Sequence, residues 1–190
     1  MAARSLVQIW NRALGWCRAD TVVDPDEDTA SARRCRRYYE QSRDAVLRAY
    51  PWNCAGARAA LSASATAPAF QWAYRYKLPT DFLAVREIYG AATEAYVVED
   101  GYIMTDIAAP LRLVYTKTVT DPARFDPLCA DAIAARLAFD MAPELIESAT
   151  QTEVLEKRYR LVLAEARQVD AAEGRAPEAD ERLPWIEARS

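Results

Sequence analysis

Residues 94–105, with the sequence Glu94-Ala-Tyr-Val-Val-Glu-Asp-Gly-Tyr-Ile-Met-Thr105, decide the fold class of this chain. Two short runs rich in strand-forming residues flank Asp100-Gly101, a dipeptide preferred in tight hairpin turns. Residues 111–118 alternate as a third strand, and the segment around residues 83–89 is expected to supply a fourth. The sequence therefore predicts a small antiparallel sheet within residues 70–118.

Apolar residues at helical spacing flank this predicted sheet on both sides. Before it, they predict helices at about residues 4–16 and 29–50, and after it at about residues 122–141 and 150–172. The segment 55–69 is rich in Ala and Ser and is compatible with a strand, a loop or a helix end. We therefore expect an α+β fold, mainly α, in which a helical bundle carries an inserted antiparallel sheet.

The C-terminal residues differ in character from the rest of the chain. We expect a single domain over residues 1–172 and an extended arm over residues 173–190, which ends in Leu183-Pro-Trp-Ile-Glu-Ala-Arg-Ser190. A Trp and an Ile that follow a polar, Pro-bearing linker cannot easily form a core of their own, and aromatic and Arg side chains are typical anchors of protein interfaces. Docking onto a partner chain is the favoured interpretation, and folding back onto the domain is the alternative.

Composition narrows the function classes. The chain has 190 residues, a formal net charge of −4, five glycines and no histidine. The negative charge disfavours tight electrostatic binding of nucleic acid or anionic membrane. Without histidine, the commonest general base and zinc ligand are missing, and the glycines do not have the spacing of a phosphate-binding loop. These features predict a mostly helical protein that is not an enzyme and carries no cofactor.

The cysteines and the apolar runs give no sign of a metal site or a membrane segment. The four cysteines form no C-x-x-C pair, so we interpret them as small buried hydrophobic residues in a reducing cytoplasm: Cys17, Cys35, Cys54 and Cys129. No apolar run reaches the about 18 residues of a membrane span. We expect synthesis and folding in the cytoplasm, with no bound metal.

Carboxylates crowd the predicted sheet, and two of them in a cleft could act as an acid and base pair. They are Asp81, Glu87, Glu94, Glu99, Asp100 and Asp106. Acids on strands and turns are more often solvated, and no nucleophile and base occur at a motif spacing. The favoured interpretation assigns them no catalytic role.

Arg33, Arg34, Arg36 and Arg37 form the one basic cluster. Neighbouring helical residues point in different directions, so these side chains surround the helix instead of forming a stripe that could follow a nucleic-acid backbone. The acids at residues 20–28 are available as counter-charges. Ion pairing within the chain or between subunits is the favoured interpretation, and DNA binding is the alternative.

A longer set of residues resembles a known family. Trp52-Asn-Cys-Ala55 follows the long predicted helix, and Trp72-Ala-Tyr-Arg-Tyr-Lys-Leu-Pro-Thr-Asp-Phe-Leu83 and Leu113-Val-Tyr-Thr116 follow in turn. With the helix at residues 125–141 and the terminal Trp-Ile-x-x-Arg, this pattern resembles the tail tubular protein A family, the head-to-tail adaptors of short-tailed bacteriophages. The resemblance covers about residues 5–143 and the C-terminal end.

The resemblance implies a structural virion protein at the head-tail junction, assembled in the cytoplasm of a bacterial host. It implies a ring of about twelve copies under the portal protein, which extends the DNA channel. The ring would offer a platform to a downstream tail protein, such as a nozzle or tail-completion component. Double-stranded DNA would pass through the lumen without specific binding, which a mildly acidic chain suits.

The resemblance also implies roles for individual residues. The C-terminal arm would dock into the portal through Leu183, Trp185, Ile186 and Arg189. The motif residues would be structural, with Asp81 capping local backbone N–H groups in a turn: Trp52, Asn53, Trp72, Tyr74, Leu78, Pro79, Asp81 and Phe82. Two other functions stay open, a DNA-binding regulator that uses the arginine cluster and a hydrolytic tail component that uses paired carboxylates.

Overall fold

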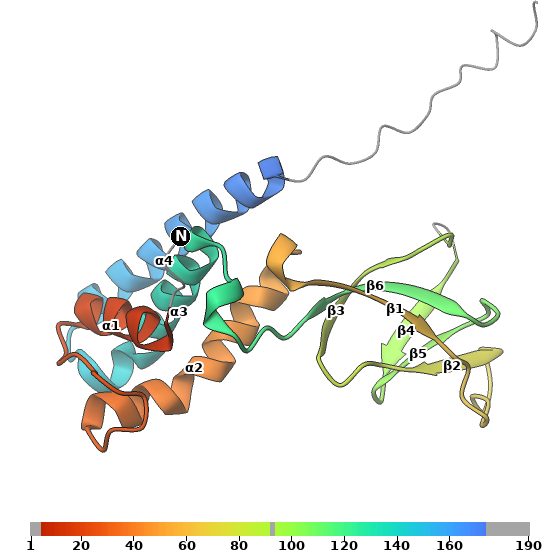
Figure 1. The fold of residues 1–190 in the computed structure, drawn as a ribbon, viewed down its shortest axis with the longest axis horizontal. Helices are drawn as coiled ribbons and strands as arrows, with labels where there is room; N and C mark the ends of the chain where they lie inside the picture. The colour runs from red at the N-terminus through yellow and green to blue at the C-terminus, as the bar shows by residue number, and fades with distance from the viewer. Residues whose placement is uncertain (1–4, 92–93, 174–190) are drawn as a thin grey trace, which may run out of the picture.

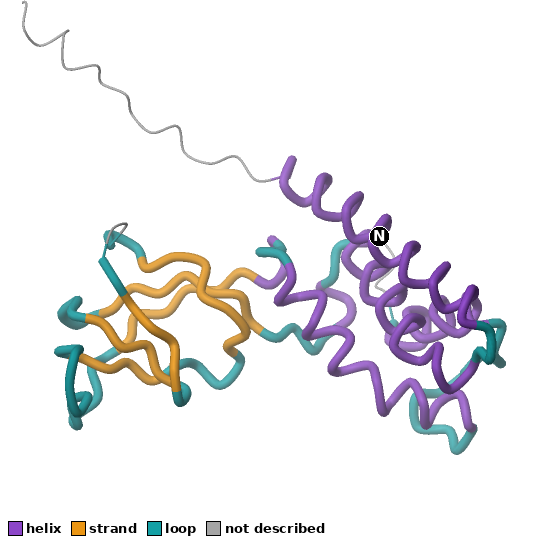
Figure 2. Tube along the Cα trace, turned by 180° about the vertical axis from the view of Figure 1, so that it is seen from behind, coloured by secondary structure: helices purple, strands orange, loops and turns teal. Residues whose placement is uncertain are grey.

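The computed structural model describes residues 5–91 and 94–173. Within them the chain forms two lobes at opposite ends of an elongated molecule (Figure 1, Figure 2). The helical lobe contains α1 (Leu6–Cys17), α2 (Ala30–Ala49), α3 (Pro127–Leu145) and α4 (Ala149–Glu173). The β-lobe contains β1 (Gly56–Leu61), β2 (Tyr74–Lys77), β3 (Phe82–Ile88), β4 (Tyr96–Glu99), β5 (Tyr102–Thr105) and β6 (Leu111–Lys117). The predicted α+β class, mainly α, is confirmed.

Side-chain caps set where the helices begin. Ser5 and Gln8 form a capping box at the start of α1, and the Thr29 hydroxyl accepts the Ala32 N–H at the start of α2. These groups satisfy backbone donors that have no partner inside the first helical turn. The helices predicted at 4–16, 29–50 and 150–172 agree with the observed bounds to within about two residues.

The prediction of one helix over residues 122–141 is wrong at both ends. Residues 122–124 form a separate 3₁₀ turn, and α3 begins at Pro127 because the Asp126 carboxylate accepts the amides of Leu128 and Cys129. The helix then continues past residue 141 to Leu145, with Pro143 inside its last turn.

Helix α3 is the centre of the helical lobe. Helices α1, α2 and α4 each pack against it, and its core-facing positions are mostly alanines that allow close approach. The largest fully buried side chains of this core are Trp10, Leu14, Leu47, Trp52, Ile133, Leu137 and Met141. Burying side chains of this size is the main stabilising contribution to the lobe.

The β-lobe contains two three-stranded antiparallel sheets, with strand orders β1-β6-β3 and β2-β5-β4. The predicted hairpin is confirmed as β4 and β5, and both turn residues have positive φ, 48° at Asp100 and 74° at Gly101. The prediction of one sheet over 70–118 is wrong, because β1 begins at Gly56 and pairs along β6. The alanine-rich sequence of β1 hides this strand, since alanine has a weak strand preference.

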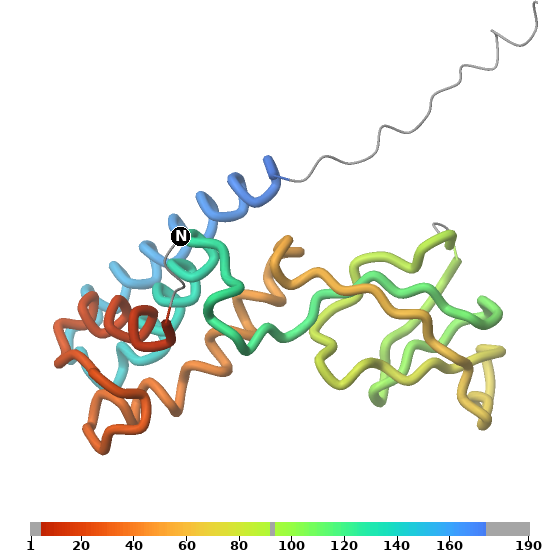
Figure 3. Tube along the Cα trace, viewed as in Figure 1, coloured from red at the N-terminus to blue at the C-terminus, as the bar shows by residue number. Residues whose placement is uncertain are grey.

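The chain enters the β-lobe once and returns once, as the path of the tube in Figure 3 shows. Ala63 forms an isolated antiparallel bridge with Tyr76, and the Ser64 N–H donates to the Arg75 carbonyl at 2.9 Å, so residues after β1 join the two sheets. Between the sheets lies a second core, made of Tyr76, Ile88, Ile103, Leu111, Leu113 and Tyr115. Each lobe therefore has its own hydrophobic core. None of the helices in the described part is long and apolar enough to cross a membrane.

Candidate functional site

Two arginines of the basic cluster bond to the loop that precedes their own helix. Arg33 forms an ion pair with the Asp28 carboxylate, which confirms that the upstream acids supply a counter-charge. The Arg36 guanidinium donates to the backbone carbonyls of Pro25 and Glu27. These two arginines therefore hold the loop of residues 25–28 against the first turns of α2.

The other two arginines converge on Glu144, in the last turn of α3. Its carboxylate oxygens lie 2.9 Å from Arg37 Nη1 and 3.5 Å from Arg34 Nε, and the Tyr38 hydroxyl donates to it at 2.6 Å. The Tyr38 hydrogen bond, followed by the charge of Arg37, holds the pKa of Glu144 below its usual value. The cluster joins α2 to α3, so any ion pair between subunits would compete with these bonds.

Asn53 ties the end of the helical lobe to the start of the β-lobe. Its backbone N–H lies 3.1 and 3.2 Å from the two carboxylate oxygens of Asp170, and its side-chain amide donates to the Asp170 carbonyl at 2.9 Å. Asp170 is buried near the end of α4, and burial raises the pKa of its carboxyl above the usual value. A turn that leads into β1 is thereby fastened to the last helix.

Trp52 and Arg86 make a second link at the same junction. The Trp52 side chain is fully buried in the helical core and its indole N–H donates to the Val46 carbonyl at 2.8 Å. Its own carbonyl accepts Arg86 Nη2 at 2.6 Å, while Arg86 Nε donates to Thr116 Oγ1 at 2.9 Å. Gly56 leaves room for this guanidinium, because a Cβ there would lie 3.1 Å from Arg86 Nη1. Trp52 and Asn53 therefore hold the two lobes together.

The Leu-Pro-Thr-Asp segment turns the chain into β3, but its acid has a different partner from the one predicted. Among the described residues, the Asp81 carboxylate accepts the Tyr115 hydroxyl at 3.0 Å, and a local backbone N–H is not its partner. The turn itself is closed by the Phe82 N–H and the Pro79 carbonyl at 3.1 Å. Phe82 stacks on Tyr115 with ring centroids 6.0 Å apart. These residues join β3 to β6 inside the β-lobe.

The remaining motif residues lie elsewhere in the β-lobe. Tyr74 and Leu78 pack against its core, and Trp72 borders a hollow of about 530 Å³ over the β2-β5-β4 sheet, beside Arg75. The structure thus divides the motif between the lobe junction, the β-lobe core and this hollow. It does not bring the motif residues together at one chemical site.

Charge networks that sequence spacing could not reveal involve Glu144, Asp170 and Arg86. Glu144 and Asp170 lie more than 100 residues from the groups they bind. Only the fold brings these partners together. A charged residue predicted to lie on an otherwise buried helix face is the one signal that could mark such positions in advance.

Two of the six acids named for the predicted sheet, Asp106 and Asp81, accept hydrogen bonds inside the β-lobe. Asp106 accepts the Ala73 N–H at 2.8 Å, and Asp81 is bonded to Tyr115 as described. In the described part of the chain, groups of three or more acidic, cysteine or histidine side chains placed to hold a metal ion do not occur. The paired-carboxylate hypothesis gains no supporting geometry from these contacts.

Large apolar side chains lie exposed along one side of α4. Val154, Leu161 and Val169 recur at steps of seven and eight residues, about two helical turns each, and Leu161 is 72% exposed. The β-lobe exposes a second apolar group of Phe70, Tyr89, Tyr96 and Val98. Exposed apolar side chains of this kind are available for contact with another chain.

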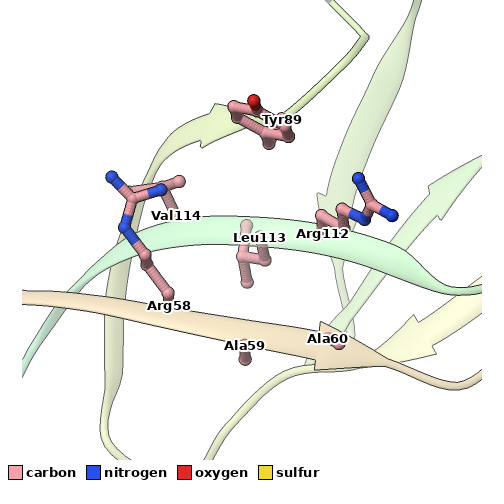
Figure 4. A pocket seen from close by; sticks show the side chains of 7 residues that line it. All are labelled: Arg58, Ala59, Ala60, Tyr89, Arg112, Leu113 and Val114. Atoms are coloured by element: carbon pink, nitrogen blue, oxygen red, sulfur yellow. The ribbon is translucent and has the colours of Figure 1, made fainter.

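A shallow groove of about 310 Å³ lies on the outer face of the β1-β6-β3 sheet. Figure 4 shows Arg58 and Arg112 at its two ends and Tyr89 over the strand between them. The described residues offer neither arginine a carboxylate partner, so the groove presents two free cations beside an aromatic ring. An acidic or aromatic segment of another chain has the chemistry to occupy it.

The predicted docking residues of the C-terminal arm, Leu183, Trp185, Ile186 and Arg189, lie outside the described residues.

No protein-family model matches the chain, and no curated protein matches it. The chain's own residues and fold carry the case for its function.

Proposed function

We propose that this chain is a structural virion protein, a head-to-tail adaptor that forms a ring of about twelve copies under the portal protein. In this role it extends the DNA channel and offers an attachment platform to the next tail protein. It performs no catalytic step and needs no cofactor. The resemblance of the Trp52 and Leu78 to Phe82 segments to the tail tubular protein A family suggests the role.

The exposed apolar side of α4 is the observation that carries the proposal. A closed ring requires heterologous contacts, in which one face of each copy meets a different face of its neighbour. The exposed apolar side chains of α4 lie in the helical lobe, and those of the β-lobe belong to a different surface. One copy can therefore present the first surface to the second surface of its neighbour, as a heterologous contact requires. We assign the partner of the α4 face to a second copy of this chain.

The arginine cluster favours an adaptor over a DNA-binding regulator. All four arginines have partners in their own chain, so releasing them to phosphates would break existing bonds. A net charge of −4 suits a conduit along which DNA slides without specific binding.

The first experiment is mass photometry of the full chain, alone and mixed with the portal protein encoded in the same genome. Addition of about a dozen copies to each portal ring is expected. A chain that stays apart from the portal at micromolar concentration would overturn the adaptor function. Salt-dependent retention on DNA would then support the regulatory alternative.

A matched pair of variants tests the contact surface. Leu161→Asp places a charge on the α4 face and should reduce the number of copies on the portal. Val23→Asp places the same charge on Val23, an exposed valine in the loop between α1 and α2, and should assemble as the unmodified chain does. Equal assembly by the two variants would refute the assignment of α4 as a ring contact.

The arm has its own test. Deleting residues 176–190 should abolish portal binding while leaving the melting temperature unchanged, since these residues follow the last described helix. Binding that survives the deletion would refute docking through Trp185 and Ile186.

A further inference from the structure

The outer face of the β1-β6-β3 sheet can be followed row by row from the strand register. Opposite residues of an antiparallel pair point to the same side of a sheet, and so do alternate residues along a strand. From the helical lobe outward, the rows of this face are Gly56 with Thr116, Arg58 with Val114, and Ala60 with Arg112. The intervening residues of β6 point the other way, into the β-lobe core. Each row lies about 6.6 Å beyond the previous one.

Helix α4 ends beside the first of these rows. Thr116 Oγ1 accepts Arg86 Nε at 2.9 Å, and the same guanidinium donates to the Trp52 carbonyl at 2.6 Å. The next residue, Asn53, donates its backbone N–H to the carboxylate of Asp170, in the last turn of α4. The chain therefore leaves α4 next to the end of the outer face that adjoins the helical lobe.

The second and third rows each carry an arginine without an ion-pair partner among the described residues. Arg58 and Arg112 are exposed and border the groove of about 310 Å³, together with Tyr89, which is 56% exposed. Figure 4 shows their guanidinium groups on either side of Tyr89. Glu87 lies opposite Val114 on β3, but neither arginine is ion-paired with it in the described part of the chain. Two cations thus stand one row apart without a counter-charge.

The segment that follows α4 carries opposite charges at a matching spacing. Its acidic stretch is Glu178-Ala-Asp-Glu181, and Glu178 is five residues beyond Glu173, the last residue of α4. Five extended residues span about 17 Å, whereas the Arg58 row is only about 6.6 Å beyond the first row, so the stretch can reach the groove of its own chain. Alternate residues of an extended chain are also about 6.6 Å apart, which is the spacing of the two arginine rows.

We propose that residues 174–181 lie along this outer face of their own chain, with the Glu178 carboxylate on Arg58 and the Asp180 carboxylate on Arg112. Bonds between a guanidinium and a carboxylate are among the strongest hydrogen bonds in proteins, and their geometry is specific. Between the two arginines the face carries Ala60 and Val114, whose short side chains let a backbone lie close to the strands. Exposed ion pairs add little to global stability, so this contact positions the segment without changing the melting temperature.

The contact gives the end of the chain a direction. Residues after 181 leave the groove at the Arg112 row, which is the row farthest from the helical lobe. The contact itself does not depend on the adaptor function. Under that function, it presents the portal-docking residues 183–189 at the outer end of the β-lobe, away from α4.

The test compares backbone amide NMR spectra of the full chain and of the double variant Glu178→Gln and Asp180→Asn. Loss of the two carboxylates should shift the amides of the two outer rows, and dilution should not alter these shifts, because the contact lies within one chain. Glu187→Gln is the control, since it removes a carboxylate from the same segment beyond the proposed contact. It should leave the outer-row amides where they are.

Reversing the groove charges gives an independent measurement. Trypsin cleaves after Arg182, directly beyond the acidic stretch, and docking should slow this cut relative to the same cut in a synthetic peptide of the segment. The double variant Arg58→Glu and Arg112→Glu should raise the rate several-fold. The double variant Arg18→Glu and Arg124→Glu makes the same charge change on exposed arginines outside the β-lobe, and should leave the rate unchanged.

Three results would overturn the proposal. The first is a set of outer-row amides that do not respond to loss of the two acids. The second is a response that depends on protein concentration, because a second copy would then occupy the groove. The third is an equal rate of trypsin cleavage in the two charge-reversed variants. All four substituted arginines are exposed, so these variants should fold, which far-ultraviolet circular dichroism checks.

Discussion

Two tryptophans in the helical core differ in a single hydrogen bond. Trp10 and Trp52 are 2% and 0% exposed, and each meets a tyrosine ring edge to face, Tyr39 at 6.1 Å and Tyr50 at 5.1 Å between ring centroids. The Trp52 indole N–H donates to a carbonyl, whereas the Trp10 indole N–H has no acceptor among the described residues. Replacing each with phenylalanine therefore isolates the contribution of that bond.

The expected magnitudes follow from burial and from the polar atom removed. Each substitution removes apolar area whose burial contributes roughly 1 kcal/mol, and each leaves a small cavity. Trp52→Phe also loses a hydrogen bond, which adds about 1 kcal/mol and gives a total loss of at least about 2 kcal/mol. Trp10→Phe instead removes a buried donor that has no partner. The free energy of unfolding rises by about 1–3 kcal/mol for that reason, which offsets the lost burial and the cavity and leaves a net change near zero.

Urea unfolding followed by far-ultraviolet circular dichroism measures both variants without relying on tryptophan fluorescence. With a slope of about 2 kcal/mol per molar urea, the two midpoints should differ by roughly 1 M, with Trp52→Phe the less stable. Equal destabilisation would refute the reasoning. It would mean that the Trp10 N–H is already satisfied, for example by the face of the Tyr39 ring.

Three further substitutions have effects of predictable sign. The folded state depresses the Glu144 pKa, so its contribution to stability is present at neutral pH and is lost as pH falls through that lowered value. The melting-temperature deficit of Glu144→Gln should therefore be largest at pH 7 and shrink in acid, and a deficit independent of pH would contradict this. Gly15 lies inside α1 with open space around its Cα, so Gly15→Ala should stabilise by about 0.5–1 kcal/mol. Gly101 has φ of +74°, so Gly101→Ala should cost about 1–2 kcal/mol, and thermal melts should show opposite shifts for the two glycine variants.

Elements with a strong local signal could be predicted from the sequence. The hairpin follows from Asp100-Gly101 between two strand-forming runs, and three helices follow from their apolar spacing, because both signals depend on neighbouring residues. Strand β1 could not be placed, because its alanines pack in a sheet only when β6 is alongside. The start of α3 depends on one cap, Asp126, inside a stretch where the apolar spacing continues without a break.

The candidate site was less accessible to sequence reasoning than the fold. Counter-charges for the arginine cluster were predicted upstream, and Asp28 is one of them. The partner of the other two arginines, Glu144, is more than 100 residues away and carries no local signal. Asp81 illustrates the same limit, since its local turn suggests a backbone partner while the tertiary fold supplies the Tyr115 hydroxyl.

The junction between the lobes has a different physical basis from the lobes themselves. Each lobe buries its own apolar core, and the apolar contact between them includes Leu83 of β3, which packs against the helical core. Directional hydrogen bonds also cross the junction, from Arg86 to the Trp52 carbonyl and from Arg48 to the Leu83 carbonyl. Directional bonds fix an orientation more than they add stability, because each contributes only about 1 kcal/mol while its geometry is narrow. The adaptor ring proposed above would need that property, since all its copies would have to present the same angle between a portal-facing and a tail-facing surface.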